Sequence, residues 1–404
     1  MQFAIMVSTV IALLLLFFLT LTHFHSVFKT QHTFFLLSID ETNRSIIETG
    51  KNITSEKVNQ PLPIHTLVHK NNWGAFEMVE STTVFKNSSY SKKAMLGTKP
   101  EQPFSGLYLS DTRLPLVLTG NSKIEGIVYV SDRGIKSGSI SGNHFTGTMP
   151  APGEIKSSTG KLPHYDPLWK SYHKQMLEYI PIHSDIVESP GVEIINSFFE
   201  ETTYVYMREK LVISEKYTGY IILKSETEIV ISKHANLTDV LVVAPKITIE
   251  SGFKGNAYFL ASDQIIVEDQ VYLDYPSSLI LYDDKTIEES NTPPHIIPIQ
   301  ISENTQVKGV VIYLTDKAQE YHTKTNLSIE PTAIIKGEIY CEGNIELYGT
   351  VKGTVYAHRF VTNKFGSVYI NHLFDGKILG NYLSEKYCGI PFENSKNKVV
   401  KWLY

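Results

Sequence analysis

Hydrophobic and polar positions follow a short recurring pattern along this chain: an apolar residue, Lys or Glu, Gly, any residue, an apolar residue and Tyr. The copies begin at Ile124, Phe253, Ile335 and Val351, and a looser copy begins at Val307. Recurrence of this kind is typical of repeat proteins, in which each unit buries its apolar face against the next unit. The pattern therefore predicts short strands stacked in a solenoid, with an ordinary β-sandwich as the alternative because its strands also recur at short spacing.

A second set of strands supports the repeat. The segments 229–231, 247–249 and 265–267 each place two β-branched apolar residues around a central one, and they follow each other at intervals of 18 residues. A rung of this length accommodates about three short strands with their turns. We therefore expect a mainly β chain built as a single-stranded β-helix. Departures from the interval, such as 28 residues between Gly309 and Gly337, are expected to be loop insertions at turns, one of them at 291–295.

Five glycines recur in the pattern and are the structural positions that we single out. A rung corner needs a sharp turn, often through positive φ, which glycine adopts at little cost. The lysine before the glycine is expected to point outwards, where it keeps the surface soluble and discourages edge pairing. A stripe that binds a polyanion is the alternative role of these lysines. The corner glycines are Gly126, Gly255, Gly309, Gly337 and Gly353.

The N-terminal segment 3–22 carries no charge, and thirteen of its twenty residues are Leu, Ile, Phe or Val. It is long enough to span a bilayer as a helix, and these side chains favour insertion by about 4 to 8 kcal/mol in total. A cleaved signal peptide is the alternative, but no basic residue precedes the run and no Ala-x-Ala follows it. We expect a retained single-pass anchor in the inner membrane, with the bilayer as its partner and the large domain extracytoplasmic.

Composition shifts divide the chain into six segments. Asp166 followed by Pro167 predicts a helix from 166 to 180, with Met176, Leu177 and Ile180 towards the core. The last thirty residues are expected to cover the final rung and hide its edge. The expected segments are an anchor (1–25), a membrane-proximal stalk and entry region (26–105), first β repeats (106–149), a helical insertion (150–210), a β-solenoid (211–373) and a C-terminal cap (374–404).

Charge and cysteine content narrow the function classes. The net charge is −5 and the pI about 6.3, so nucleic acid is not an expected partner. Cys341 and Cys388 are the two cysteines; they form either one disulfide or two unpaired core thiols, and no CxxC indicates zinc.

Sequence motifs for catalysis are absent, and we expect no catalytic, cofactor-binding or metal-binding residues. Asp283-Asp284 follows the apolar strand 279–281. Paired carboxylates on neighbouring rungs perform acid–base chemistry in sugar-cleaving enzymes, but consecutive aspartates at a strand end are typical of a turn. No cofactor is therefore expected.

The runs 334–360 and 123–130 resemble bactofilins, which are polymer-forming bacterial β-helix proteins with short rungs and Gly at the corners. The resemblance implies a rigid bacterial scaffold, and frequent Ile, Lys, Asn and Tyr are consistent with an AT-rich bacterium. The apolar helix leading into a β domain is also similar to pilin-like envelope proteins. Their helices carry Glu five residues after the cleavage point, whereas position 5 here is Ile5.

Three functions are weighed. The first is a non-enzymatic, membrane-anchored scaffold or assembly component of the cell envelope, whose partners are its own copies or envelope proteins. The second is a carbohydrate-binding or carbohydrate-active β-helix, which requires outward tyrosines as stacking platforms. The third is a pilus or secretion-apparatus accessory protein. The second fails if these tyrosines form an inward ladder; they are Tyr129, Tyr258, Tyr340 and Tyr356.

Overall fold

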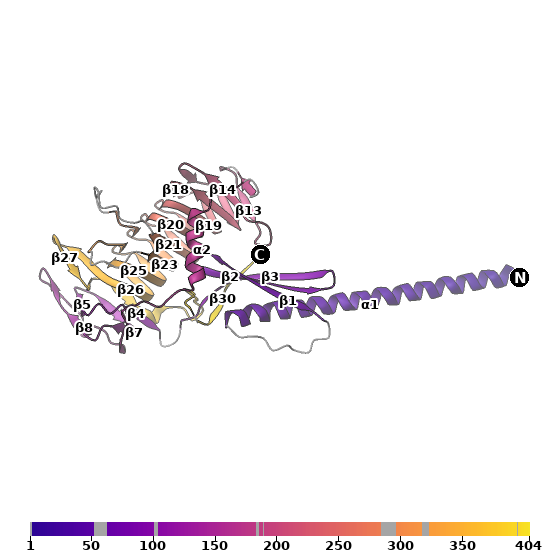
Figure 1. Ribbon diagram of the computed structural model, residues 1–404, viewed down its shortest axis with the longest axis horizontal. Helices are drawn as coiled ribbons and strands as arrows, with labels where there is room; N and C mark the ends of the chain where they lie inside the picture. Colours follow the sequence, from indigo (N-terminus) through magenta and orange to yellow (C-terminus); the bar gives the residue numbers. More distant parts are fainter. Residues whose placement is uncertain are drawn as a thin grey trace. The chain divides into compact units, whose positions relative to one another are not determined.

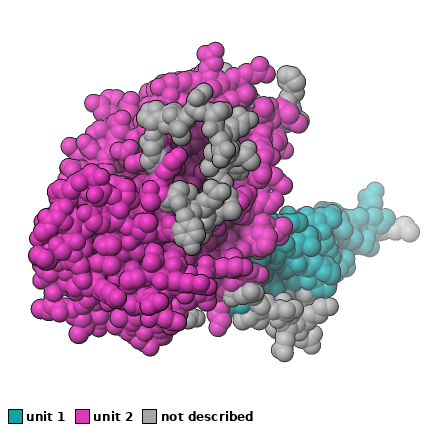
Figure 2. All heavy atoms as spheres, turned by 60° about the vertical axis from the view of Figure 1, so that its left-hand side comes forward, with its two compact units in different colours: residues 1–70, 79–94 teal, residues 71–78, 95–404 magenta. Residues whose placement is uncertain are grey.

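The computed structural model is mainly β, with 51% strand and 18% helix. It describes residues 2–51, 63–100, 104–182, 186–188, 190–283, 296–316, 323–393 and 395–404. The loop insertion predicted at 291–295 and Asp284 lie outside these residues. The chain divides into two compact units, residues 1–70 with 79–94 and residues 71–78 with 95–404 (Figure 2).

The first unit contains one long helix, α1 (Gln2–Gly50) (Figure 1). Its apolar N-terminal part is long enough to cross a membrane. None of the residues in the most apolar stretch of this helix is buried. The later part of the helix is amphipathic, because its buried residues recur every four positions and so lie on one helix face. They are Phe34, Ser38, Thr42, Ile46 and Gly50.

Strands within the first unit pack on this buried face. The Phe34 and Phe85 rings are 5.9 Å apart, and the Ser45 and Ser81 hydroxyls form a 2.6 Å hydrogen bond. The strands belong to a sheet of order β1-β2-β3-β30, which the sequence analysis did not predict. Its members are β1 (His65–Trp73), β2 (Phe76–Phe85), β3 (Ser88–Thr98) and β30 (Asn397–Leu403).

The second unit is built mainly from parallel strands, which pair in three ladders (Figure 1). Long strands bend at a corner and so contribute to more than one ladder. In spatial order, the first ladder contains β13 (Ile194–Asn196), β16 (Lys216–Gly219), β19 (Asn236–Ile249), β20 (Lys254–Val267), β21 (Tyr272–Asp283), β23 (Gln306–Thr315), β25 (Ile334–Leu347), β26 (Thr350–Lys364), β29 (Lys377–Leu379) and β6 (Lys123–Glu125).

The second ladder uses the middle of the same long strands and adds short strands at both ends. They are β12 (Ile186–Glu188), β14 (Thr203–Met207) and β17 (Ile221–Ser225) before β19, and β4 (Ser105–Leu109), β7 (Ile127–Val130) and β11 (Ile155–Ser157) after β26. The final edge of β26 is therefore paired with β4. Among the last thirty residues, β29 pairs with β26 in the first ladder, whereas residues 397–403 join a different sheet.

The third ladder contains the 18-residue set of strands. Ile229, Ile247 and Ile265 pair in register as predicted, and all three side chains are fully buried. Its members are β15 (Leu211–Ile213), β18 (Glu228–Ile231), the ends of β19 and β20, β22 (Ile299–Ile301), β24 (Leu327–Ile329) and the end of β25; a related parallel sheet has the order β28 (His372–Phe374), β5 (Leu116–Thr119), β8 (Ile135–Ser137).

Small elements complete the second unit. Helix α2 (Pro167–Glu178) begins at Asp166, whose carboxylate accepts a hydrogen bond from the Leu168 N–H as the cap prediction requires. Its buried side chains are Trp169 and His173. Met176 and Leu177 are partly buried against the same hydrophobic cluster, as predicted, whereas Ile180 is exposed and the prediction for it is wrong. The others are β9 (Ser139–Ile140), β10 (Asn143–His144), β27 (Ser367–Ile370) and the 3-10 turn η1 (Gly380–Tyr382).

Two hydrophobic clusters follow from strand alternation. One fills the space enclosed by the ladders and is made of Ile, Val and Leu, with Val311, Ile339 and Val355 stacked in register. The other lies on the outer face of the second ladder and contains Tyr258 and Tyr340. Because successive strand residues point to opposite faces, the repeat tyrosines lie outside the enclosed core.

Candidate functional site

A column of glycines runs across three adjacent strands at the corner between the first and second ladders. Gly309 pairs with Gly337, and Gly337 pairs with Gly353. Their φ values are 141°, 151° and 154°, which L side chains rarely adopt. A Cβ on Gly337 would lie 1.8 Å from the Gly309 carbonyl oxygen, so the glycine column also allows neighbouring strands to lie close together.

The other two predicted corner glycines, Gly126 and Gly255, do not belong to this column. Gly126 has a φ of 100° and packs against the backbone of Phe104 and Gly106. Gly255 has no positive φ and pairs with Leu273, so it lies outside the column. Its strand β20 is separated from β23, the strand of Gly309, by β21 alone.

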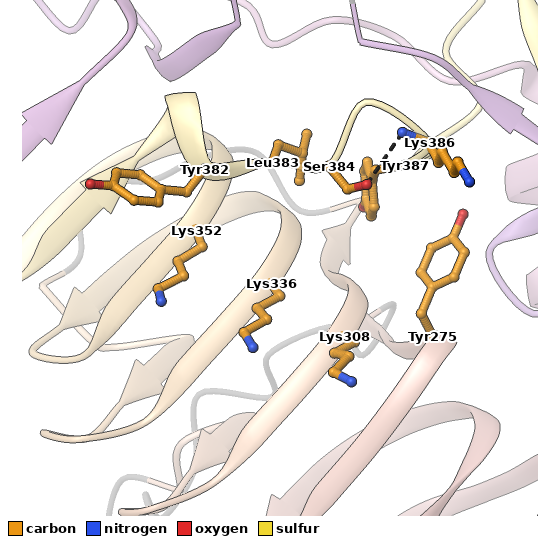
Figure 3. Close-up of a pocket in the computed structure, with 9 residues that line it drawn as sticks. All are labelled: Tyr275, Lys308, Lys336, Lys352, Tyr382, Leu383, Ser384, Lys386 and Tyr387. Carbon is orange, nitrogen blue, oxygen red and sulfur yellow. Dashed lines mark hydrogen bonds between the residues drawn. The ribbon is translucent and has the colours of Figure 1, made fainter.

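Three lysines precede the glycines of the column and form a second column. Lys308 pairs with Lys336, and Lys336 pairs with Lys352. Figure 3 shows the three side chains in a row on neighbouring strands, with Tyr275 at the Lys308 end and Tyr382 at the Lys352 end. They line a groove with a volume of about 490 Å³, here called the lysine groove. Its lining is Tyr275, Lys308, Lys336, Lys352, Tyr382, Leu383, Ser384, Lys386 and Tyr387.

The segment 382–387 forms one wall of the lysine groove because it packs on the glycine column. The Tyr387 hydroxyl donates a 3.1 Å hydrogen bond to the Gly309 carbonyl. The Tyr275 hydroxyl donates to the Cys388 carbonyl at 2.9 Å. The Lys386 N–H donates to the Ser384 hydroxyl at 3.3 Å (Figure 3). The wall is therefore fixed to the strands at two separate points.

The groove is positively charged. Lys308 donates a 2.9 Å hydrogen bond to Asp274, which raises the pKa of Lys308. Lys336 and Lys352 form no ion pair with any residue that the structure describes. Lys352 lies 6.0 Å from the centre of the Tyr382 ring, and Lys308 lies 4.7 Å from that of Tyr272. The groove thus presents ammonium groups beside aromatic rings and aliphatic lysine stems.

A row of tyrosines lies on the outer face of the second ladder and is here called the tyrosine row. Tyr340, Tyr356, Tyr108 and Tyr129 pair in that order across four adjacent strands. Adjacent ring centres are 6.3, 6.4 and 5.4 Å apart. The inward alternative for the tyrosines of this row is therefore wrong.

Only part of this row is accessible. Tyr340 is 2% exposed and donates a hydrogen bond to the Pro163 carbonyl at 3.0 Å. Tyr258, the fourth predicted platform, is fully buried near Phe76 and Met95. Tyr108, Tyr129 and Tyr356 are half-buried and line a cavity of about 630 Å³ with Lys156, Lys396 and Phe392.

Glu338 is a buried acid that contributes to the lining of that cavity. Its Oε2 accepts a 2.8 Å hydrogen bond from the Ile390 N–H. Burial raises the pKa of Glu338 to about 7, and the hydrogen bond opposes the rise. The sequence analysis did not single out this residue, although it directly follows Gly337 in the repeat.

The aspartate and the cysteines that the sequence analysis considered have structural roles in the described part of the chain. Asp283 ends β21 and accepts a hydrogen bond from the Tyr313 hydroxyl at 3.0 Å. Cys341 and Cys388 are both buried free thiols, which decides between the two cysteine alternatives. Among the described residues, no three His, Cys, Asp or Glu side chains gather as metal ligands would.

Sequence reasoning found three members of the tyrosine row but missed Tyr108, and it missed Tyr275 and Tyr382 of the lysine groove. Tyr108 follows Gly106 by two residues, whereas Tyr129 follows Gly126 by three, because the register shifts between Ser105 and Leu107. Tyr275 and Tyr382 lie outside the repeat and meet the lysines only through folding. The lysine spacing was visible in the repeat and did indicate a stripe.

Comparisons with known proteins return no match: no protein-family model, no curated protein and no solved structure is significantly similar to this chain. Its function is therefore argued from its own geometry.

Proposed function

We propose that this protein is a membrane-anchored β-solenoid that acts as a non-enzymatic scaffold or assembly component of the bacterial cell envelope. The observation that carries the proposal is the parallel, in-register stacking of Val311, Ile339 and Val355 and of their counterparts in neighbouring strands. In such a stack each rung contacts only its neighbours, and the resulting surface is extended and regular. The bactofilin-like repeat is consistent with this role.

The long apolar helix supplies the anchor in this proposal. Side chains from Phe3 to Phe24 are exposed and almost all apolar, which is unfavourable in water and favourable in lipid. The second half of α1 then links the membrane to the strands of the first unit. We place the large domain outside the inner membrane, because long domains translocate largely regardless of their charge.

A protease-accessibility experiment tests this assignment. Cleavage of the β domain in spheroplasts, with protection in intact cells, is the expected result. Protection in both, with cleavage only after lysis, would place the domain in the cytoplasm and would contradict the envelope scaffold in favour of a cytoskeletal one.

The tyrosine row supports carbohydrate binding as a second candidate function. Tyr108, Tyr129 and Tyr356 present three neighbouring rings to a cavity, and the apolar face of a sugar packs on aromatic rings of this kind. Replacing Tyr129 and Tyr356 by Ala should abolish retention on immobilised neutral glycans, whereas Tyr369→Ala, on a peripheral strand, should not. Equal retention of both variants would exclude this function.

A further inference from the structure

The lysine column is not explained by edge protection. Strand lysines often guard a sheet edge against pairing with another chain. Here β23 pairs with β21 and β25, and β25 pairs with β23 and β26. Lys308 and Lys336 therefore lie on central strands whose two sides are already paired, and they need another explanation.

Like charges directly opposite each other on neighbouring strands are also destabilising. Elsewhere in the same fold, strand lysines alternate with carboxylates. Lys210 and Lys246 lie on either side of Glu228, at 3.4 Å each. In the lysine groove Lys336 lies between Lys308 and Lys352, and of these three only Lys308 has a carboxylate partner, Asp274, among the residues that the structure describes. The like charges of this column thus reduce stability, and edge protection does not account for them.

The spacing of the column fits a linear repeating ligand. Neighbouring strands lie about 4.8 Å apart, so the three lysines carry a charge at each step of a straight line across the strands. A polymer laid along the groove would meet one ammonium per step, and each ammonium has three N–H donors for a carboxylate. The wall held by Tyr387 keeps the groove open before any ligand binds.

The aromatic rings of the lysine groove indicate which class of anionic polymer fits it. Tyr275 and Tyr382 flank the row, and Leu383 and the lysine stems add apolar surface between them. Sugar rings have an apolar face for such surfaces, which an inorganic polyphosphate lacks. Single-stranded nucleic acid favours aromatic residues interleaved with the cations, whereas these tyrosines stand at the two ends of the row.

We propose that the lysine groove binds a linear acidic polysaccharide, with the carboxylates of successive sugars on Lys308, Lys336 and Lys352 and sugar rings against Tyr275 and Tyr382. This site is separate from the tyrosine row, and it does not depend on the scaffold role. The glycan chain would lie across the strands, along the line of the three lysines, and would hold the β domain to it.

Binding is measured with the full chain in non-ionic detergent, by fluorescence anisotropy of end-labelled oligogalacturonate and oligomannuronate long enough to span three strands. We expect at least one to bind, and its methyl-esterified, uncharged form not to bind. K336Q/K352Q should weaken binding by roughly fivefold per lysine, about 25-fold in all. Tyr382→Ala, as a separate single variant, should also weaken binding of the uronate.

The matched control is K210Q/K246Q, which removes the same charge from lysines that already have a carboxylate partner. It should bind within about twofold of wild type. Because K336Q/K352Q removes like-charge repulsion, its unfolding temperature should equal or exceed that of wild type, so lost binding would not reflect misfolding. The proposal is overturned if neither uronate binds, if K336Q/K352Q binds as wild type does, or if polyglutamate or oligothymidylate binds as tightly through the same lysines.

Discussion

Single glycines decide whether neighbouring strands of this protein can approach each other. Gly337 meets two separate constraints: a φ of 151° and a carbonyl oxygen 1.8 Å from where its Cβ would be. Gly252 meets only the first, since its φ is 83° and nothing lies within 4 Å of its Cβ position. Comparing substitutions at Gly337 and Gly252 therefore separates the free-energy cost of the positive φ from the cost of the contact with the neighbouring strand.

Gly337→Ala is therefore expected to destabilise the fold by more than about 3 kcal/mol, because the backbone of two strands must move apart. Gly252→Ala should cost only about 1–2 kcal/mol, the penalty for a left-handed conformation. Chemical denaturation of both variants measures the difference. Equal losses would show that the carbonyl contact does not limit the stacking.

Glu338 makes the stability of the fold depend on pH. Burial raises its pKa from 4.5 to about 7, so the folded state binds more protons than the unfolded state between these values. Stability is therefore highest below pH 4.5 and falls as the pH rises towards 7, by about 3 kcal/mol from this group.

Glu338→Gln should remove that dependence, because the amide is neutral and its oxygen still accepts the Ile390 N–H. At pH 8 the variant should be more stable than wild type, and at pH 4 the two should be similar. Glu209→Gln, at an exposed position, is the control. Denaturation curves at several pH values give the slopes, and parallel slopes for wild type and Glu338→Gln would contradict the assignment.

At the scale of elements, the order of strands in space differs from their order along the chain. Strands β4 and β7 come early in the sequence but follow β26 in the second ladder. Val355 pairs with Leu107, and the Thr354 hydroxyl donates a 2.6 Å hydrogen bond to the Ser105 carbonyl. The earlier segment thus pairs with the last long strand, so β26 has no free edge in the second ladder.

Engineered cysteines test this arrangement. In a chain with Cys341→Ala and Cys388→Ser, Y356C/Y108C should form a disulfide under mild oxidation, because adjacent strands are about 4.8 Å apart. Y356C/K156C should not, since its positions are three strands, or about 14 Å, apart. Gel mobility without reductant distinguishes them, and failure of the first pair would mean that β4 lies elsewhere.

The repeat predicted individual rungs better than their order. Ile229, Ile247 and Ile265 stack as expected because an in-register ladder places like side chains over each other. The partner of β26 was not predictable, since every rung presents the same backbone donors and acceptors and a similar apolar face. The sheet of β1 to β3 was missed although Asn71 to Gly74 is a turn signal between two strands. Tyr108 was missed because a register shift changes its spacing from glycine.

At the scale of the whole molecule, one helix serves two environments. Before about residue 30, α1 is apolar and exposed, and beyond it one face packs on strands of the first unit. The polar residues Ser38 and Thr42 on that face satisfy their hydroxyls on helix carbonyls four residues earlier, at 2.7 and 2.6 Å. The change from apolar to amphipathic pattern marks where lipid contact is expected to end.

Two charges within the apolar part should abolish membrane attachment. Each lysine at the centre of a spanning helix costs about 3 kcal/mol, so L14K/L16K offsets most of the 4–8 kcal/mol that favours insertion. Phe35→Lys places a charge at a 50% exposed position of the same helix beyond the apolar run, and should leave attachment intact. Alkaline extraction of membranes separates the two: wild type and Phe35→Lys should stay in the pellet, and L14K/L16K should not. Mass spectrometry of the extracted wild type should show residues 3–22 still present, because a mature chain without them would mean that the helix is a cleaved signal and not an anchor.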